Sequence, residues 1–227
     1  MIVRYKVLYD VFNYRVSRIP IEYILKVKFF YEYKFYIFYP LLIPRNDTIK
    51  ILYLFRSVYS KSFIKYVLDC GCGSGILSIS FFSIFKLLKY VALDSSYLSF
   101  NLFKFNFKLR QISYFYCNWF YLFFGIKKFD IIVSNPPYLS YDELSYNFIS
   151  YFFEYRNALL ANMSGFYDLR DIILFSYDIL FKNGILLLEH SYSQAKQVRK
   201  VMISCGFINV CTFYDFGNLS RFTYAEK

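Results

Sequence analysis

The segment DIIVSNPPY, residues 130–138, ends an apolar run with an amide, two prolines and a phenol. Neither proline offers an N–H, and Asn135 before Pro136 is driven toward extended geometry, so the run must end in a stiff turn. The turn would hold an amide and an aromatic ring at the carboxyl end of a strand. In open parallel sheets, ligands bind in the crevice outside that edge. We therefore predict a binding site at residues 135–138.

A second candidate is the glycine-rich segment LDCGCGSG, residues 68–75. Asp69 lies at the end of an apolar run, and glycines at alternate positions let the backbone pass close to a ligand and enter a helix. A dinucleotide fingerprint needs a further glycine three residues after Gly73, where Ile76 stands, and the Gly-Lys-Ser/Thr of a phosphate loop is absent. The spacing favours the loop of S-adenosylmethionine-dependent methyltransferases, with a purely structural strand-to-helix turn as the alternative.

Three further residues could complete a nucleoside site. Asp94 ends the run VALD, where a carboxylate can accept both ribose hydroxyls, unless it only caps the next helix. Asn118 could bond the edge of adenine, and Trp119, the single tryptophan of the chain, could cover its ring. Together with the glycine loop, they predict a site for S-adenosylmethionine.

The sequence NPPY is a signature of enzymes that methylate a planar amino nitrogen, in an amide or a nucleobase. The lone pair of such a nitrogen is delocalised and therefore a poor nucleophile. The Asn135 side-chain oxygen and the Pro136 carbonyl would each accept one of its N–H bonds and aim the lone pair at a methyl donor, while Tyr138 packs on the flat group. Positioning and electrostatics would contribute most, and no strong base is needed.

The elements that must position these residues alternate between short apolar runs and longer helical stretches. Strands separated by helices predict a mostly parallel α/β sheet covered on both faces. The last two strands have only a short connection, so one should lie antiparallel at the end of the sheet. The expected strands are 66–71, 89–96, 112–120, 129–134, 184–190, 207–216 and 220–226, and the expected helices are 74–88, 96–109, 170–181 and 194–206.

The N-terminal segment differs from the rest in pattern. Residues 26–40 predict a β-hairpin of aromatic and charged residues, and within the next segment, residues 42–55, Asp47 or Thr48 is predicted to cap the start of a helix. We expect an N-terminal segment of residues 1–60, too small to fold alone, that packs over the binding edge of a main domain formed by residues 61–227.

Composition limits the class of protein. The chain has 227 residues, 57% of them hydrophobic, and its longest uncharged runs, residues 70–85 and 111–126, are shorter than a membrane-spanning helix needs. A soluble, cytoplasmic protein is expected. The five cysteines and the single histidine form neither a recognisable zinc site nor a disulfide framework, so no metal is predicted. His190, Cys70 and Cys72 are interpreted as structural. The net charge of +11 indicates either an acidic partner or a lysine-rich surface.

From Arg18 to about Arg221, the chain resembles the release-factor glutamine methyltransferases. The matching segments include RIPIEYIL, LLIPRNDT, LDCGCGSGILSIS, FDIIVSNPPYLS, GILLLEHSYSQAKQVRKVMISCGF and DFGNLSR. The resemblance implies a seven-stranded, Rossmann-like class I methyltransferase fold. It also implies methylation of the glutamine in the Gly-Gly-Gln motif of class I peptide chain release factors. Implied cofactor contacts are Asp69, Gly71, Cys72, Gly73, Ser74, Gly75, Asp94, Asn118, Trp119 and Asn135, and implied substrate contacts are Asn135, Pro136, Pro137 and Tyr138, of which Asn135, Pro136 and Tyr138 are the catalytic residues.

The chain also departs from this family's pattern. Little precedes Arg18, where the family carries a helical domain that grips the release factor, and Asn118, Lys26 and Tyr155 replace the usual acid, Gly and Pro. These changes affect affinity and grip more than reaction type. They fit a reduced genome, as in an endosymbiont or an organelle. A monomer near the ribosome is expected, without direct contact to nucleic acid or membrane.

Other functions stay open at this point. A ribosomal-protein glutamine methyltransferase would share the same motifs. A nucleic-acid amino methyltransferase would fit the +11 charge, but would lack the LIPR and LLLEH blocks and carry a target-recognition insert. A catalytically dead scaffold on the ribosome or a release factor is a third reading, although its unused motifs should have eroded.

Overall fold

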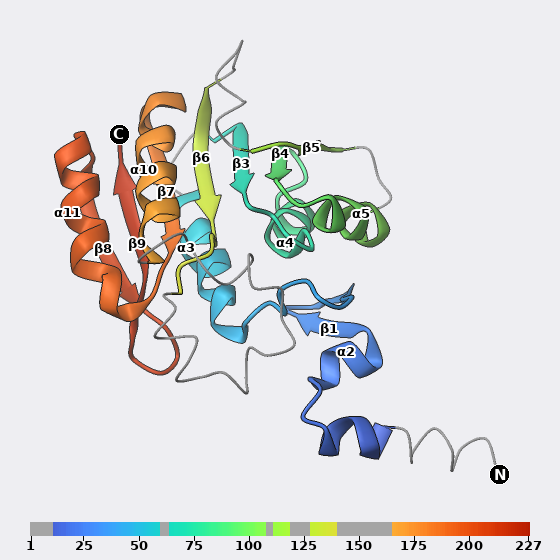
Figure 1. Cartoon of the computed structure of the whole chain (residues 1–227). Coiled ribbons are helices and arrows are strands. Elements are labelled where there is room, and N and C mark those ends of the chain that lie inside the picture. Colours follow the sequence, from blue (N-terminus) through green and yellow to red (C-terminus); the bar gives the residue numbers. More distant parts are fainter. Residues whose placement is uncertain (1–10, 60–63, 108–110, 119–127, 140–164) are drawn as a thin grey trace.

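The computed structural model describes residues 11–59, 64–107, 111–118, 128–139 and 165–227 of the chain (Figure 1). A seven-stranded sheet lies at its centre. Within this sheet, the adjacent strands among β5, β4, β3, β6 and β7 pair in parallel. Strand β9 pairs antiparallel with both β7 and β8. In spatial order the strands are β5 (Ile112–Tyr116), β4 (Lys89–Asp94), β3 (Tyr66–Cys70), β6 (Phe129–Ser134), β7 (Leu180–Glu189), β9 (Ser220–Glu226) and β8 (Ile208–Tyr214).

The predicted α/β sheet and its antiparallel strand are therefore confirmed, with one correction. We expected the antiparallel strand at the end of the sheet, but β9 is second from the edge, and β8 lies outside it. After β7, helix α11 (Ala195–Cys205) leads to β8, which lies one strand position away from β7. Strand β9 then runs back and fills the position between β7 and β8. Both backbone edges of β9 are thereby paired, and β5 and β8 are the two edge strands of the sheet.

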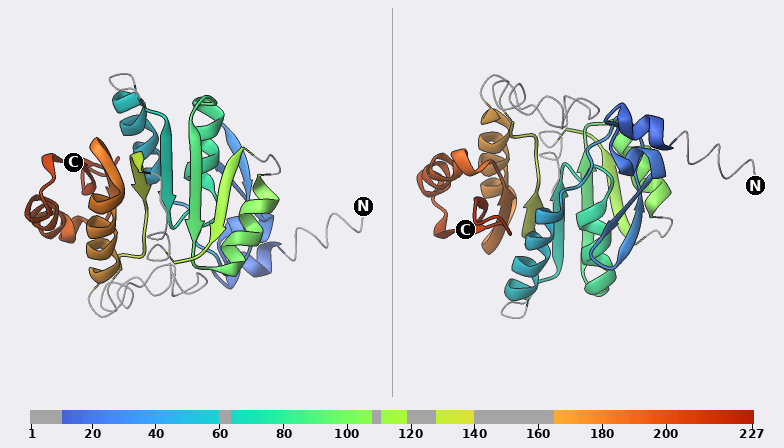
Figure 2. Two further views of the ribbon diagram at one scale, coloured as in Figure 1. Left: turned by 90° about the horizontal axis from the view of Figure 1, so that it is seen from above. Right: turned by 90° about the horizontal axis from the view of Figure 1, so that it is seen from below.

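Helices cover both faces of the sheet, because neighbouring strand residues point in opposite directions. Val67 and Ile131 belong to the apolar cluster on one face, and Leu68 and Ile132 to the cluster on the other. Figure 2 shows α3 and α10 on opposite sides of the sheet. The first face packs on α3 (Ile49–Tyr59), α4 (Ile76–Ile84) and α5 (Tyr97–Asn106), and the second on α10 (Tyr167–Ile179) and α11 (Ala195–Cys205).

Local chemistry explains where several helices begin and end. Ser96 caps α5, because its hydroxyl oxygen accepts a hydrogen bond from the Ser99 N–H at 3.3 Å. The 3₁₀ turn η3 (Tyr192–Gln194) carries a reciprocal capping box between Ser191 and Gln194 and leads directly into α11. Gly206, the last residue of the expected helix 194–206, has a left-handed φ of 102° at the end of α11.

The N-terminal segment forms the predicted hairpin and shares the core of the sheet. After a helical stretch at residues 11–16 come α2 (Ile21–Leu25), β1 (Val27–Phe30) and β2 (Tyr33–Tyr36). Phe30 and Phe35 are buried in the same cluster as α3 and the first face of the sheet. The segment is thus integrated with the main domain, as its small size requires.

The predicted helix cap in this segment is wrong. Residues Asn46–Thr48 form a 3₁₀ turn, η1, which runs into α3 without a side-chain cap. Asp47 Oδ1 instead accepts a hydrogen bond from the Phe216 N–H at 3.2 Å, and Thr48 is buried. A contact 169 residues away in sequence has replaced the local cap that the pattern suggested.

No helix within the described ranges is long and apolar enough to cross a membrane.

Candidate active site

The predicted glycine loop lies where the order of the sheet reverses, since β3 has β4 on one side and β6 on the other. Gly71, Gly73 and Gly75 all have left-handed φ angles, of 73°, 53° and 82°. Side chains at Gly71 and Gly73 would meet no atom within 4 Å, whereas one at Gly75 would lie 2.5 Å from Phe103 Cδ2. The first two glycines therefore border open space, and the third permits packing of α5 on α4.

Asp69 lies in β3, one residue before its end, and is almost completely buried. Its Oδ2 accepts hydrogen bonds from the Ser78 N–H at 3.1 Å and the Ser78 hydroxyl at 2.6 Å. Oδ1 has no hydrogen-bonding partner among the described residues. Burial raises the pKa of this carboxyl to about 7, although the two Ser78 bonds oppose the shift. A ligand that offers a cationic N–H donor would satisfy Oδ1.

Asp94 ends β4, as predicted, and its two oxygens fix the neighbouring loops. Oδ2 accepts a hydrogen bond from the Gly73 N–H and Oδ1 one from the Ser96 N–H, both at 2.8 Å. Because Ser96 is the N-cap of α5, the helix-capping alternative for Asp94 does not hold. Burial raises the pKa of Asp94, and its bonds to the Gly73 and Ser96 N–H groups oppose the shift.

The NPPY turn follows β6 at the same edge of the sheet. The Ser134 hydroxyl donates a hydrogen bond to the Cys70 carbonyl at 2.7 Å, which fixes the end of β6 against β3. The Asn135 side chain has no hydrogen-bonding partner in the part of the chain that the structure describes, and Pro136 is buried. The Tyr138 hydroxyl donates to Glu189 Oε1 at 3.1 Å. The phenol of this turn is thus held in place.

A cavity of about 460 Å³ joins the glycine loop to this turn. That volume is typical of sites that hold a cofactor-sized ligand. The strand ends, the loop after β4 and the N-terminal segment all contribute to it, so the expected position of that segment over the binding edge is confirmed. The lining residues are Leu41, Leu42, Pro44, Thr48, Asp69, Gly71, Cys72, Gly73, Ser74, Ile76, Leu77, Asp94, Ser95, Ser96, Tyr97, Leu98, Ser99, Tyr116, Asn135 and Pro137.

The structure does not bring every predicted site residue to this cavity. Asn118 is exposed and is not among the lining residues, and Trp119 lies outside the described residues. Gly75, Pro136 and Tyr138 are not lining residues either, although Gly75 lies against Phe103 and Tyr138 is bonded to Glu189. Their roles toward cofactor and substrate stay predictions.

Tyr116 is a lining residue that the sequence reasoning missed. It ends β5 and pairs with Asp94 in the register of the sheet, so it reaches the same edge. The rule that strand ends line the site predicts this position, whereas the rarity of tryptophan favoured Trp119, three residues later. Leu41 and Leu42 were missed as individual residues, because the loop that carries them has no periodic pattern.

His190 and the two cysteines are structural, as interpreted. Both ring nitrogens of His190 are bonded, Nδ1 to the Ser191 carbonyl at 2.9 Å and Nε2 to the Thr223 hydroxyl at 2.8 Å. Burial lowers the pKa of His190 to about 4, so the ring is neutral at pH 7. Burial also raises the pKa of the Cys70 and Cys72 thiols, which excludes a thiolate nucleophile at neutral pH.

Known proteins match both the sequence and the fold. Residues 53–165 match the family model of the methyltransferase small domain. The release factor glutamine methyltransferase of Buchnera aphidicola subsp. Schizaphis graminum is 33% identical over 211 residues, which cover 92% of this chain and 76% of that protein. That of Shewanella oneidensis is 33% identical over 215 residues, or 93% and 74% of the two chains.

Among solved structures, the ribosomal protein L11 methylase of Lactobacillus delbrueckii subsp. bulgaricus has a TM-score of 0.57 and 19% identity, and covers 82% of this chain and 80% of its own. A precorrin-6y C5,15-methyltransferase of Geobacter metallireducens has a TM-score of 0.56 and 14% identity, with 82% and 92% coverage. The fold is that of the class I methyltransferases. Within that class, this chain belongs to the release factor glutamine methyltransferase family.

Proposed function

We propose that this protein transfers the methyl group of S-adenosylmethionine to the side-chain amide nitrogen of the glutamine in the Gly-Gly-Gln motif of a class I release factor. The observation that carries the proposal is the position of Asn135. Asn135 lines the same cavity as Asp94 and the glycine loop, so a flat amide held by the NPPY turn would meet a cofactor held by those residues.

The donors and acceptors around the cavity fit this cofactor. Asp94 would accept the ribose hydroxyls, and Asp69 Oδ1, which lacks a partner among the described residues, would accept the ammonium group. Gly71 and Gly73 leave open space where a side chain would stand. When bound, S-adenosylmethionine supplies a sulfonium methyl group. The electrons of the broken C–S bond stay on sulfur when the methyl group is transferred.

The NPPY turn would activate the glutamine by orientation. The Asn135 side-chain oxygen accepts one N–H of the amide and the Pro136 carbonyl accepts the other, which localises the nitrogen lone pair. Tyr138 packs on the flat amide, and its hydroxyl is held by Glu189. The nitrogen loses one proton to water as the N–C bond forms. Since orientation supplies most of the rate, neither the neutral His190 nor the protonated cysteines are needed as bases.

The family to which the chain belongs supports a protein amide over a nucleobase as the substrate. Three relatives of 33–34% identity, each matched over more than nine tenths of this chain, are named release factor glutamine methyltransferases. These relatives are bacterial, and the proposal accordingly places the enzyme in a bacterial cytoplasm or its organelle equivalent, as a monomer that acts near the ribosome.

The test is a methyl-transfer assay with labelled S-adenosylmethionine. The acceptors are a purified class I release factor, the same factor with its Gly-Gly-Gln changed to Gly-Gly-Ala, a ribosomal protein L11, and bulk DNA and RNA. We expect label in the intact release factor alone. Asn135→Ala should reduce transfer by at least about 100-fold at saturating cofactor, in line with the loss of one oriented catalytic contact.

Asn101→Ala is the matched control for this variant, since Asn101 is exposed on α5. Label in nucleic acid but not in the release factor would overturn the proposal in favour of a nucleobase methyltransferase. Label in the ribosomal protein alone would overturn the release factor as the partner. Cofactor binding without label in any acceptor would favour a scaffold.

A further inference from the structure

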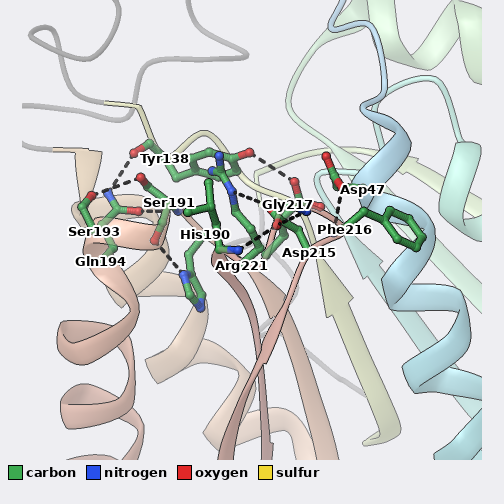
Figure 3. Close-up of polar contacts among 12 residues, drawn as sticks. Asp47, Tyr138, His190, Ser191, Ser193, Gln194, Asp215, Phe216, Gly217 and Arg221 are labelled. Carbon is green, nitrogen blue, oxygen red and sulfur yellow. Dashed lines mark hydrogen bonds and ion pairs between the residues drawn. The ribbon is translucent and has the colours of Figure 1, made fainter.

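Gln194 ends the 3₁₀ turn η3 and is buried, yet the proposed chemistry assigns it no part. Its side-chain amide makes three hydrogen bonds. Figure 3 shows Gln194 beside Ser191 and Tyr138, which are two of its three partners. Oε1 accepts from the Ser191 N–H at 3.0 Å, and Nε2 donates to the Tyr138 carbonyl at 2.8 Å and to the Gly165 carbonyl at 2.7 Å. Both N–H bonds of the amide are thus directed at backbone carbonyls.

These carbonyls lie on either side of residues 140–164. Tyr138 is the last residue of the NPPY turn, and Gly165, with a left-handed φ of 73°, precedes α10. One side-chain amide therefore fixes two backbone points that are 27 positions apart in the sequence. The Tyr138 side chain of the same turn packs on the buried cluster between α10 and the sheet.

The turn itself explains why an outside donor is needed. Pro136 and Pro137 have no N–H, so two successive residues of the turn cannot donate a backbone hydrogen bond. The carbonyl and the hydroxyl of Tyr138 remain as points of attachment. Gln194 holds the first at 2.8 Å, and Glu189 holds the second at 3.1 Å.

Both attachments come from one short segment, residues 189–194, which comprises the last residue of β7 and the connection to α11. This connection is rigid, because the His190 N–H donates to the Arg221 carbonyl at 2.9 Å and both His190 ring nitrogens are bonded. Ser191 and Gln194 close the capping box that starts α11. Tyr138 is therefore held at two points by a segment anchored in the sheet.

We propose that Gln194 is a positioning residue for methyl transfer, which sets the place of the Asn135–Tyr138 turn through the Tyr138 carbonyl. This inference rests on the proposed function for its kinetic consequence. Its structural part concerns the turn alone and can be tested without any substrate.

Gln194→Glu is the variant that tests it, because glutamate has nearly the same shape but, when ionised, places an acceptor oxygen where Nε2 now donates to both carbonyls. Gln197→Glu is the matched control, with the same charge change on an exposed position of α11. For each variant, kcat and KM for the release factor are measured at saturating S-adenosylmethionine. The dissociation constant for S-adenosylhomocysteine and the melting temperature are measured alongside.

We expect Gln194→Glu to lower kcat by about tenfold or more, while the affinity for S-adenosylhomocysteine changes less than about twofold. Gln197→Glu should leave all these values unchanged. A folded Gln194→Glu protein with the wild-type kcat would overturn the proposal. So would losses of kcat and cofactor affinity that merely follow a loss of folded protein. If this variant does not fold, Gln194→Met, of similar length and without charge, takes its place under the same criteria.

Amide hydrogen exchange of the peptide that contains residues 135–139 separates this inference from the proposed function. Faster exchange at Tyr138 and Leu139 in Gln194→Glu, but not in Gln197→Glu, supports positioning even if the wild-type protein labels no release factor. Faster exchange together with an unlabelled release factor would refute the proposed substrate and leave the positioning role intact. Equal exchange in both variants and the wild type would overturn the positioning role.

Discussion

The Tyr138 hydroxyl donates a hydrogen bond to Glu189 Oε1 at 3.1 Å, across 51 residues of sequence. This bond links the NPPY turn to the carboxyl end of β7, two strands away from the glycine loop. Burial raises the pKa of Glu189 to about 7, and the nearby hydroxyls of Thr48 and Tyr138 and the charge of Arg221 oppose the shift, while the charge of Asp47 adds to it. Glu189 thus changes its protonation near neutral pH in the folded protein.

Glu189→Gln should change how stability depends on pH. The folded state holds the proton of Glu189 more tightly than the unfolded chain, whose carboxyl titrates near pH 4.5. Its contribution to the free energy of unfolding is therefore complete below pH 4.5 and is lost as pH rises to about 7. Relative to Glu189→Gln, the wild-type protein should lose about 3 kcal/mol of stability over that window.

Urea denaturation of both proteins at half-unit pH steps measures this difference. Asp69 titrates in the same range but is present in both proteins, so subtraction leaves the contribution of Glu189. Arg221 and Asp47 are likewise unchanged in both. Parallel stability curves from pH 4.5 to pH 7 would show that the folded state does not raise the pKa of Glu189.

Gly75→Ala should mainly lower stability, whereas Gly73→Ala should mainly lower cofactor affinity. Both residues have left-handed φ angles, which cost about 1–2 kcal/mol for an alanine. At Gly75 the new methyl group would also overlap the Phe103 ring, for about 1–3 kcal/mol more. At Gly73 it would meet no protein atom within 4 Å and would project into open space.

Gly75→Ala is therefore expected to lose about 2–5 kcal/mol of stability in urea denaturation, against about 1–2 kcal/mol for Gly73→Ala. Titration with S-adenosylhomocysteine should show that Gly73→Ala, despite its better stability, binds at least about tenfold more weakly than the wild type. Equal stability losses in the two variants would contradict the packing role of Gly75.

Local rules predicted the elements around these glycines well. An acid at the end of an apolar strand, glycines at alternate positions and two prolines each restrict the backbone within a few residues. Such restrictions hold in any tertiary setting, so β3, the glycine loop, β4 with Asp94, and the end of β6 lie where the sequence indicated. The hairpin β1–β2 followed from alternation in the same way.

Long-range contacts were beyond the sequence pattern, and they decide the rest of the site. Asp47 was expected to cap a helix but bonds the backbone of Phe216. Gln194 was read only as part of a helix, since nothing in its neighbourhood indicates the carbonyls of Tyr138 and Gly165. The position of β9 inside the sheet likewise depends on the geometry of a helical crossover rather than on the composition of the strand.

Binding of S-adenosylhomocysteine should release protons through Asp69. The pKa of its carboxyl is about 7 in the free protein, chiefly because of burial, and a ligand ammonium next to Oδ1 would favour the ionised form. Affinity should therefore rise with pH up to about 7 and level off above it. Calorimetry at pH 6.5 in two buffers with different ionisation enthalpies measures the released protons directly.

Asp69→Asn should abolish this pH dependence and weaken binding by about tenfold or more, as expected for the loss of one charge-assisted hydrogen bond. Asp178→Asn is the control, because Asp178 is exposed at the far end of α10. An affinity that does not vary with pH in the wild-type protein would show that Asp69 does not exchange its proton on binding.

Asn106 joins the N-terminal hairpin to the glycine loop through one side chain. Its Oδ1 accepts from the Tyr36 N–H at 2.8 Å, and its Nδ2 donates to the Tyr36 and Ser74 carbonyls, both at 3.0 Å. Phe105, next to it on α5, packs edge-on against the Tyr36 ring, with the two ring centroids 4.9 Å apart. The hairpin is thus attached to the same helix whose N-terminus borders the cavity.

Asn106→Ala should remove all three hydrogen bonds and leave the Tyr36 and Ser74 carbonyls without this donor. We expect a loss of about 1–3 kcal/mol in stability and faster amide exchange at Tyr36. Binding of S-adenosylhomocysteine should weaken as well, because Ser74 lines the cavity. Asn101→Ala, at an exposed position on the same helix, should change none of these. If exchange at Tyr36 rises while cofactor affinity stays constant, the hairpin and the glycine loop are independent, and the N-terminal segment does not support the cofactor site through Asn106.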